Sequence, residues 1–180
     1  MVSLSIPVEV LIDEHKLILK AVATLKQKVA QKELNKSINP DSITLLVDFF
    51  RMYADRFHHG KEEGILFSEL SLKELTDSDK TIMNELIGEH VFARKTVTSL
   101  ENAKQDYVNG KRDAINTIID LLQVLAKLYP VHIEKEDKHF FYPAMAYFDK
   151  EEQQNMRRKF EEFNRTFTDK RYSQIINSLK

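Results

Sequence analysis

Long segments with a helical apolar period, separated by few chain breakers, constrain this fold more than any other feature. The 180-residue chain has only four glycines and four prolines. Apolar residues recur at spacings of three and four over about residues 5–34, 39–72, 77–109 and 112–143. Four helices of about 30 residues joined by short connections favour antiparallel neighbours. We therefore expect an all-α, up-down-up-down four-helix bundle.

Local signals mark the helix ends. Ser5 and Pro7 begin the first segment, and Asn39 is placed to cap the second, with Pro40 at its first position. The loop in "LTDSDK" precedes the third segment, and Gly110 suits the position just past its end. These signals predict turns near residues 36, 75 and 110.

The last part of the chain predicts an additional helical segment. Asp149 and Glu152 resemble a capping box, and an apolar stripe follows them. We expect a bundle over residues 1–147 and a helical tail over residues 148–180 that packs on it. The stripe consists of Met156, Phe160, Phe163 and Phe167.

Composition excludes several functional classes. The net charge of −1 gives no bulk field toward nucleic acid or an anionic membrane. The chain has no cysteine, so disulfides, thiolate ligands and thiol catalysis are excluded. No secretory signal is recognisable, and no apolar run approaches the ~20 residues of a membrane span. No nucleophilic triad or phosphate-binding loop is present. We expect a cytoplasmic protein with no nucleic-acid or membrane partner.

Histidines fall on the apolar faces of all four segments. His15, His90 and His132 each have apolar residues three and four positions away. In "YADRFHHGKEEGILF", a 3.6-residue period places His58 and Glu62 on the apolar face and His59 and Glu63 toward water. A rotated helix would exchange the two pairs. Glu136 follows His132 by one turn on the same face.

Helix lengths place these inward groups at one depth. Measured from the expected turns, the four histidines and Glu62 align to within ~2–3 Å at 1.5 Å per residue. Two buried ionised glutamates need compensation that neutral imidazoles cannot give, whereas divalent cations can. Imidazole with carboxylate suits iron, zinc or manganese. Two bridging carboxylates imply two metals ~3.5–4 Å apart.

The sequence resembles the hemerythrin-like (HHE cation-binding) family over about residues 8–145. The resemblance rests on "IDEHKLI", "FHHGKEEGILF", "IGEHVFARKTV" and "HIEKEDKHFFYPA". It implies a four-helix bundle around a non-haem di-iron centre that binds or reacts with oxygen. By this resemblance the imidazole ligands are His15, His58, His90 and His132, and the bridging carboxylates are Glu62 and Glu136.

One departure from the family bears on the function. Its oxygen carriers use five histidines, two of them one turn apart on a helix, whereas the positions one turn from His90 are Leu86 and Arg94. Water, His139, a tyrosine or His59 could complete the coordination. This departure favours reactive or sensing roles over reversible oxygen carriage.

We therefore expect two iron ions, with zinc or manganese as alternatives, and a small ligand such as oxygen, nitric oxide or peroxide. The predicted role is sensing, detoxification or handling of iron and oxygen, rather than that of a dedicated enzyme. A peroxidase-like or oxidase enzyme is the second hypothesis, and a zinc-stabilised interaction module is the third. The sequence leaves the native metal, the ligand, the partner protein and the oligomeric state open.

Overall fold

The computed structural model describes residues 6–35, 39–165 and 170–178, and these residues form helices joined by short connections. Ser5 and Phe167 lie outside the described residues. The helices are α1 (Glu9–Asn35), α2 (Pro40–Asp48), η1 (Phe49–His59), η2 (Glu62–Phe67), α3 (Ser68–Leu70), α4 (Asp77–Val108), α5 (Ala114–Lys135), η3 (Glu136–Phe140), α6 (Phe141–Met145), α7 (Lys150–Arg165) and α8 (Lys170–Ser178).

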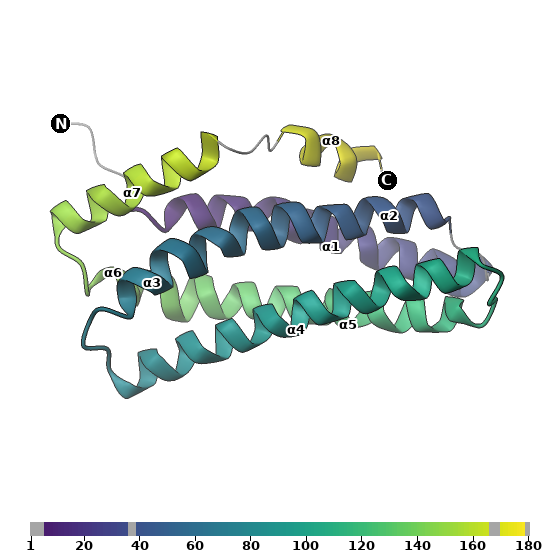
Figure 1. Cartoon of the computed structure of the whole chain (residues 1–180), viewed down its shortest axis with the longest axis horizontal. Helices are drawn as coiled ribbons and strands as arrows, with labels where there is room; N and C mark the ends of the chain where they lie inside the picture. The colour runs from purple at the N-terminus through teal and green to yellow at the C-terminus, as the bar shows by residue number, and fades with distance from the viewer. Residues whose placement is uncertain (1–5, 36–38, 166–169, 179–180) are drawn as a thin grey trace.

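These elements combine into four long rods that lie side by side (Figure 1). The first is α1, the second runs through α2, η1, η2 and α3, the third is α4, and the fourth runs through α5, η3 and α6. Successive rods run in opposite directions, with α5 packed against both α1 and α4. The predicted all-α, up-down-up-down bundle is confirmed.

The predicted helix ends also match the structure. The Asn39 side chain accepts a hydrogen bond from the Asp41 N–H at the start of α2. Thr76 caps α4 in the same way, by accepting from the Asp79 N–H. Gly110, just past α4, has φ of +95°, a left-handed conformation that glycine adopts without a Cβ clash.

The second rod departs from the predicted regular α-helix. Its segments η1 and η2 are π-helical, with i→i+5 hydrogen bonds in place of i→i+4. Each residue then turns through somewhat less than the ~100° of an α-helix, so that side-chain directions along these segments depart from a 3.6-residue period. The fourth rod contains a shorter π-helical stretch, η3. All three stretches carry residues of the buried polar layer.

That polar layer divides the apolar core into two clusters. One cluster fills the end of the bundle around α2 and the C-terminal half of α4, and includes Phe50, Leu100 and Tyr129. The other fills the opposite end, and includes Phe67 and Phe141. Between them lie most of the polar and charged residues that are buried in the described part of the chain, among them the histidines and glutamates described below.

The tail lies along the outside of the bundle (Figure 1). Met156 and Phe160 of α7 are buried in the second apolar cluster, and Ile176 of α8 is buried in the first. Phe163 packs against the first cluster from a partly buried position. The predicted capping box is present, because the Asp149 side chain accepts from the Glu152 N–H while Glu152 accepts from the Asp149 N–H. The boundary between residues 147 and 148 stays a prediction.

Among the residues that the structure describes, one helix is long and apolar enough to cross a membrane. It covers Ala114–Met145, with a mean hydropathy of 1.3 over its best window. The sequence-based expectation overlooked this stretch. Only 28 % of that window is buried, although the helix contributes Ile118, Leu125 and Ile133 to the core.

Candidate metal centre

Four buried histidines from the four rods meet in two facing pairs. The Nε2 atoms of His15 and His58 lie 2.8 Å apart, and those of His90 and His132 lie 3.1 Å apart. All four imidazoles are buried. The structure thus brings together the four histidines that the apolar periodicity singled out.

Two buried glutamates each reach both pairs. Glu62 places Oε1 3.1 Å from His58 Nε2 and Oε2 3.4 Å from His90 Nε2. Glu136 places Oε2 3.3 Å from His15 Nε2 and Oε1 3.3 Å from His132 Nε2. Each carboxylate therefore presents one oxygen to each histidine pair, as a bridge between two positions would.

A ring of carboxylates holds the outer nitrogens of these histidines. Each imidazole donates its Nδ1–H to a carboxylate of another rod, because a carboxylate is an acceptor only. The Nδ1–oxygen distances are 2.8 Å for His15 with Asp137, 2.9 Å for His58 with Glu14, 2.7 Å for His90 with Glu63, and 2.7 Å for His132 with Glu89. These contacts fix the tautomer, so that each Nε2 is unprotonated in the neutral ring and turned to the centre.

Three cations hold members of this ring in turn. The Lys61 ammonium is fully buried and forms an ion pair with Glu14. Lys135 Nζ lies 2.7 Å from Glu89, and Arg94 Nη2 lies 2.6 Å from Glu63. In this outer layer the carboxylates position the imidazoles, and the cations position three of the carboxylates.

His59 does not face water and Glu63 does so only in part, which corrects the sequence-based expectation for His59. His59 is only 1 % exposed, and Glu63 is half-buried against His90 and Arg94. The expectation assumed a 3.6-residue period, whereas η1 is π-helical and turns His58 and His59 inward together. His59 stacks on His90 with ring centroids 3.8 Å apart.

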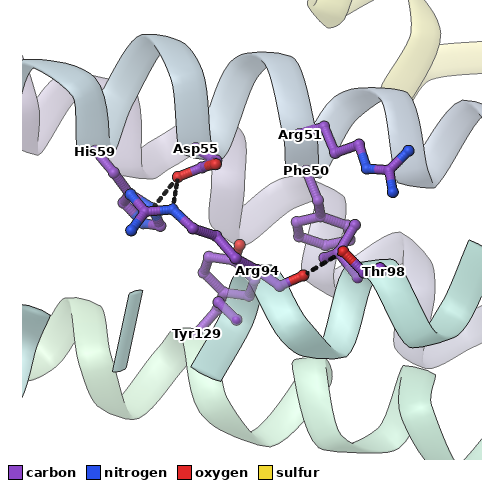
Figure 2. Close-up of a pocket in the computed structure, with 9 residues that line it drawn as sticks. Phe50, Arg51, Asp55, His59, Arg94, Thr98 and Tyr129 are labelled. Carbon is purple, nitrogen blue, oxygen red and sulfur yellow. Dashed lines mark hydrogen bonds and ion pairs between the residues drawn. The ribbon is translucent and has the colours of Figure 1, made fainter. Parts of the chain in front are cut away.

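His59 also borders a cavity of about 200 Å³ between η1 and α4 (Figure 2). Asp55 Oδ1 accepts from His59 Nδ1 at 3.3 Å and from Arg94 Nε at 2.7 Å across this cavity. The Tyr129 phenol lies on the far side, where burial raises its pKa and keeps it neutral. His139, the other histidine considered as a ligand, is exposed and outside the buried layer.

The comparison with protein families agrees with this geometry. The model of the hemerythrin HHE cation-binding domain matches residues 6–144, more than half of the chain. The chain belongs to this family. No curated protein and no solved structure matches it.

The residues of this hemerythrin-family chain fit metal ions on grounds of hydrogen bonding. All four carboxylate oxygens of Glu62 and Glu136 are buried, and none has a hydrogen-bond partner within the described residues. Facing pairs of unprotonated Nε2 atoms would likewise repel each other with nothing between them. Buried anions without donors and facing lone pairs both call for cations at the centre.

Charge points to the same conclusion. Seven carboxylates belong to this layer: the two bridges Glu62 and Glu136, and the five that accept from a histidine Nδ1. Three cations form ion pairs with the latter, namely Lys61, Arg94 and Lys135. The excess of four negative charges equals the charge of two divalent ions.

The pKa values respond to this excess of negative charge. Burial alone lowers the pKa of the His15 imidazole, but Asp137, Glu136 and Glu62 together raise it to about 10. The pKa of His90 is lowered by burial and raised by Glu136, Glu63 and Glu62 to about 9. Burial, His90 and His58 lower the pKa of His59 well below its usual value. Without a metal, the hemerythrin-type centre therefore binds protons.

Sequence reasoning missed the outer ring of this hemerythrin-type centre. Each ring carboxylate directly neighbours a central residue in the chain: Glu14 precedes His15, Glu63 follows Glu62, Glu89 precedes His90, and Asp137 follows Glu136. The signal was an acidic residue beside each inward group. It could have been found, because such a neighbour on a helix points to the adjacent rod.

Proposed function

We propose that this protein holds two iron ions between its two histidine pairs and binds or reacts with a small ligand there. Position 1 consists of His15 and His58, with Glu62 Oε1 and Glu136 Oε2. Position 2 consists of His90 and His132, with Glu62 Oε2 and Glu136 Oε1. The observation that carries the proposal is that each of the two buried glutamates presents one oxygen to each pair.

The donor set supports iron over harder cations. Imidazole and carboxylate donors suit iron, zinc and manganese, whereas calcium and magnesium prefer sites of oxygen alone. When bound, a pair of iron ions supplies redox chemistry toward oxygen, nitric oxide or peroxide, the small ligands that the family resemblance implies. A small diatomic or peroxide ligand also suits a centre enclosed by two apolar clusters.

The chain's own residues prepare the centre. The ring carboxylates hold the proton on each Nδ1 and so keep each Nε2 available to a metal. The ring of Phe141 stacks on His15 at 5.7 Å, and that of Phe67 stacks on His90 at 6.1 Å, so that apolar groups limit the approach of water. These contacts keep the geometry fixed before a metal or a ligand enters.

The test begins with metal analysis of protein purified without added metal. Two ions per chain, mostly iron, are expected. Anaerobic loading with ferrous iron, followed by absorption spectra after oxygen, peroxide or nitric oxide, then separates the roles. A stable adduct that reverses on ligand removal indicates binding or sensing, and repeated consumption of ligand indicates an enzyme. One ion per chain, or none after reconstitution with ferrous iron, would contradict the dinuclear centre. Two zinc ions and no redox spectrum would instead favour a zinc-stabilised module.

A further inference from the structure

We propose that the cavity between η1 and α4 is a second ligand site, which binds a small neutral phenol beside the metal centre. The bound phenol should in turn strengthen metal binding at position 2. The ligand site stands on the cavity alone, whereas its effect on the metal rests on the function proposed above.

The cavity has the size and the walls for one aromatic ring. Its volume is about 200 Å³, and a protein cavity of about 150 Å³ lined by apolar side chains holds benzene. The rings of Phe50 and Tyr129 border it, stacked with their centroids 5.0 Å apart. Ala93 and Val97 of α4 add apolar surface. A monocyclic aromatic molecule therefore fits the space and its lining.

The Tyr129 hydroxyl favours a ring that carries a hydroxyl of its own. The Tyr129 residue is 2 % exposed, and its hydroxyl forms no hydrogen bond with any of the described residues. The phenol extends from α5 toward the cavity, where Asp55 is a further acceptor (Figure 2). A buried hydroxyl without a partner is destabilising. A ligand hydroxyl in the cavity would supply the missing partner.

The charges around the cavity favour a neutral ligand over an anion. The Arg94 guanidinium already forms ion pairs with Asp55 and Glu63. Arg51, at the edge of the cavity, forms an ion pair with Glu101. Each cation is therefore matched by at least one carboxylate, and no positive charge is left over for an anion. A carboxylate ligand would meet repulsion from Asp55, whereas a neutral phenol would not.

The His59 ring connects the cavity to position 2. It borders the cavity and lies at 13° to the His90 ring, 3.8 Å between centroids, so it packs on that imidazole. Asp55 accepts from His59 and pairs with Arg94. Arg94 also pairs with Glu63, the acceptor of His90 Nδ1. A molecule in the cavity excludes water from these ion pairs and strengthens them. His90 should then be held more firmly toward its metal.

The first experiment measures phenol binding to the full-length, metal-free protein by calorimetry and NMR. One saturable site is expected, with contacts from the phenol ring to the Ala93 and Val97 methyl groups. Benzene, which lacks the hydroxyl, should bind about threefold to tenfold more weakly, and benzoate more weakly still. No saturable phenol binding, binding without these methyl contacts, or tighter binding of benzoate would overturn the proposal.

The second experiment removes the hydroxyl but keeps the ring. Tyr129→Phe should weaken phenol binding by about threefold to tenfold and leave benzene binding unchanged. Tyr142→Phe is the matched control, because this tyrosine is 49 % exposed and outside the cavity lining. Equal phenol affinity in the unmodified protein and in Tyr129→Phe would overturn the recognition of the hydroxyl.

The third experiment measures the coupling to the metal. Saturating phenol should tighten Co²⁺ binding by about fivefold in His58→Ala, which keeps position 2, and leave it unchanged in His132→Ala, which keeps position 1. By linkage, Co²⁺ should tighten phenol binding by the same factor.

Two outcomes would overturn the coupling. They are an unchanged Co²⁺ affinity in His58→Ala, and an equal shift when Tyr129→Phe is added to it, which would place the phenol on the metal itself. Fewer than two Co²⁺ per unmodified chain without phenol would instead refute the proposed function, and would leave the phenol site to the first two experiments.

Discussion

The two halves of the buried centre are built from the same parts but held differently. The supports of position 1 are Asp137 and Glu14, and the latter pairs with Lys61 of the second rod. The supports of position 2 include Glu63, which pairs with Arg94 of the third rod together with Asp55. Position 1 thus depends on a fully buried ammonium, and position 2 on a guanidinium that is 36 % exposed. This difference predicts that the two proposed metal positions can be altered one at a time through their outer contacts.

The largest effect is expected where the two positions share residues. Glu62→Gln/Glu136→Gln keeps side-chain size but removes both bridging charges, so the double variant should fold and lose metal at both positions. Metal bound only to the native state adds roughly 3–4 kcal/mol of stability at several hundred times Kd. Thermal melts with and without anaerobic ferrous iron should show this gain only in the unmodified protein.

The metal-free double variant provides its own control. Above about pH 10, where His15 and His90 are neutral and the buried carboxylates of the unmodified protein lack a charged partner, it should melt higher than the metal-free unmodified protein. An equal gain of stability from iron in both proteins would show that the glutamates are not ligands.

Single histidine substitutions should separate the positions. His58→Ala leaves position 1 with one imidazole, so one equivalent of metal should be lost. His132→Ala likewise leaves position 2 with one imidazole, His90, so one equivalent should be lost there while position 1 keeps its metal. Titration with Co²⁺, followed in the visible spectrum, measures both. Loss of both equivalents in either variant would contradict two separate positions.

The stability of the metal-free protein should fall at high pH. The folded pKa values of about 10 for His15 and about 9 for His90 lie above the ordinary value of about 6.5. Their contribution to stability is therefore complete below about pH 6.5 and is lost as the pH rises through 9 and 10. Melting temperatures measured from pH 6 to pH 10 should decrease. Glu62→Gln/Glu136→Gln should show a weaker dependence, and an equally steep one would place the cause elsewhere.

The smallest effects are expected from the outer cations. Arg94→Met should weaken the metal of position 2, and Lys61→Met that of position 1, each by about tenfold through the supporting carboxylate. Competition with a chelator measures both affinities. Lys159→Met, which removes an exposed ion pair with Glu69, is the control. Weakening of the same position by both variants would contradict the separate supports.

The fold was accessible from sequence because its determinants are local. Apolar periodicity and the caps at Asn39 and Gly110 were sufficient for four antiparallel rods. The convergence of the four histidines with Glu62 followed from helix length, which puts them at one depth, and that of Glu136 followed from its position one turn after His132. Their role as metal ligands remains a prediction.

His59 could not be predicted because its orientation depends on tertiary packing. A fixed 3.6-residue period turns it to the surface, and no residue type in "YADRFHHG" marks the change to a π-helix. The ion pairs of Arg94 with Asp55 and Glu63 join groups 39 and 31 residues apart, which a local pattern does not reveal. The error therefore lay in the local helix period of η1.

The buried Lys61 gives the tail a thermodynamic connection to the centre. Its ammonium donates to Asn164 of α7 at 2.9 Å while it also pairs with Glu14, the acceptor of His58 Nδ1. Detachment of α7 would remove the Asn164 contact from Lys61. Because Lys61 holds Glu14, the His58 imidazole that donates to Glu14 would then be held less firmly. If metal binding favours the arrangement of Lys61, Glu14 and His58, it also favours the docked tail. By linkage, docking of the tail favours metal binding by the same free energy. A segment outside the family match at residues 6–144 can thereby set the affinity of a site inside it.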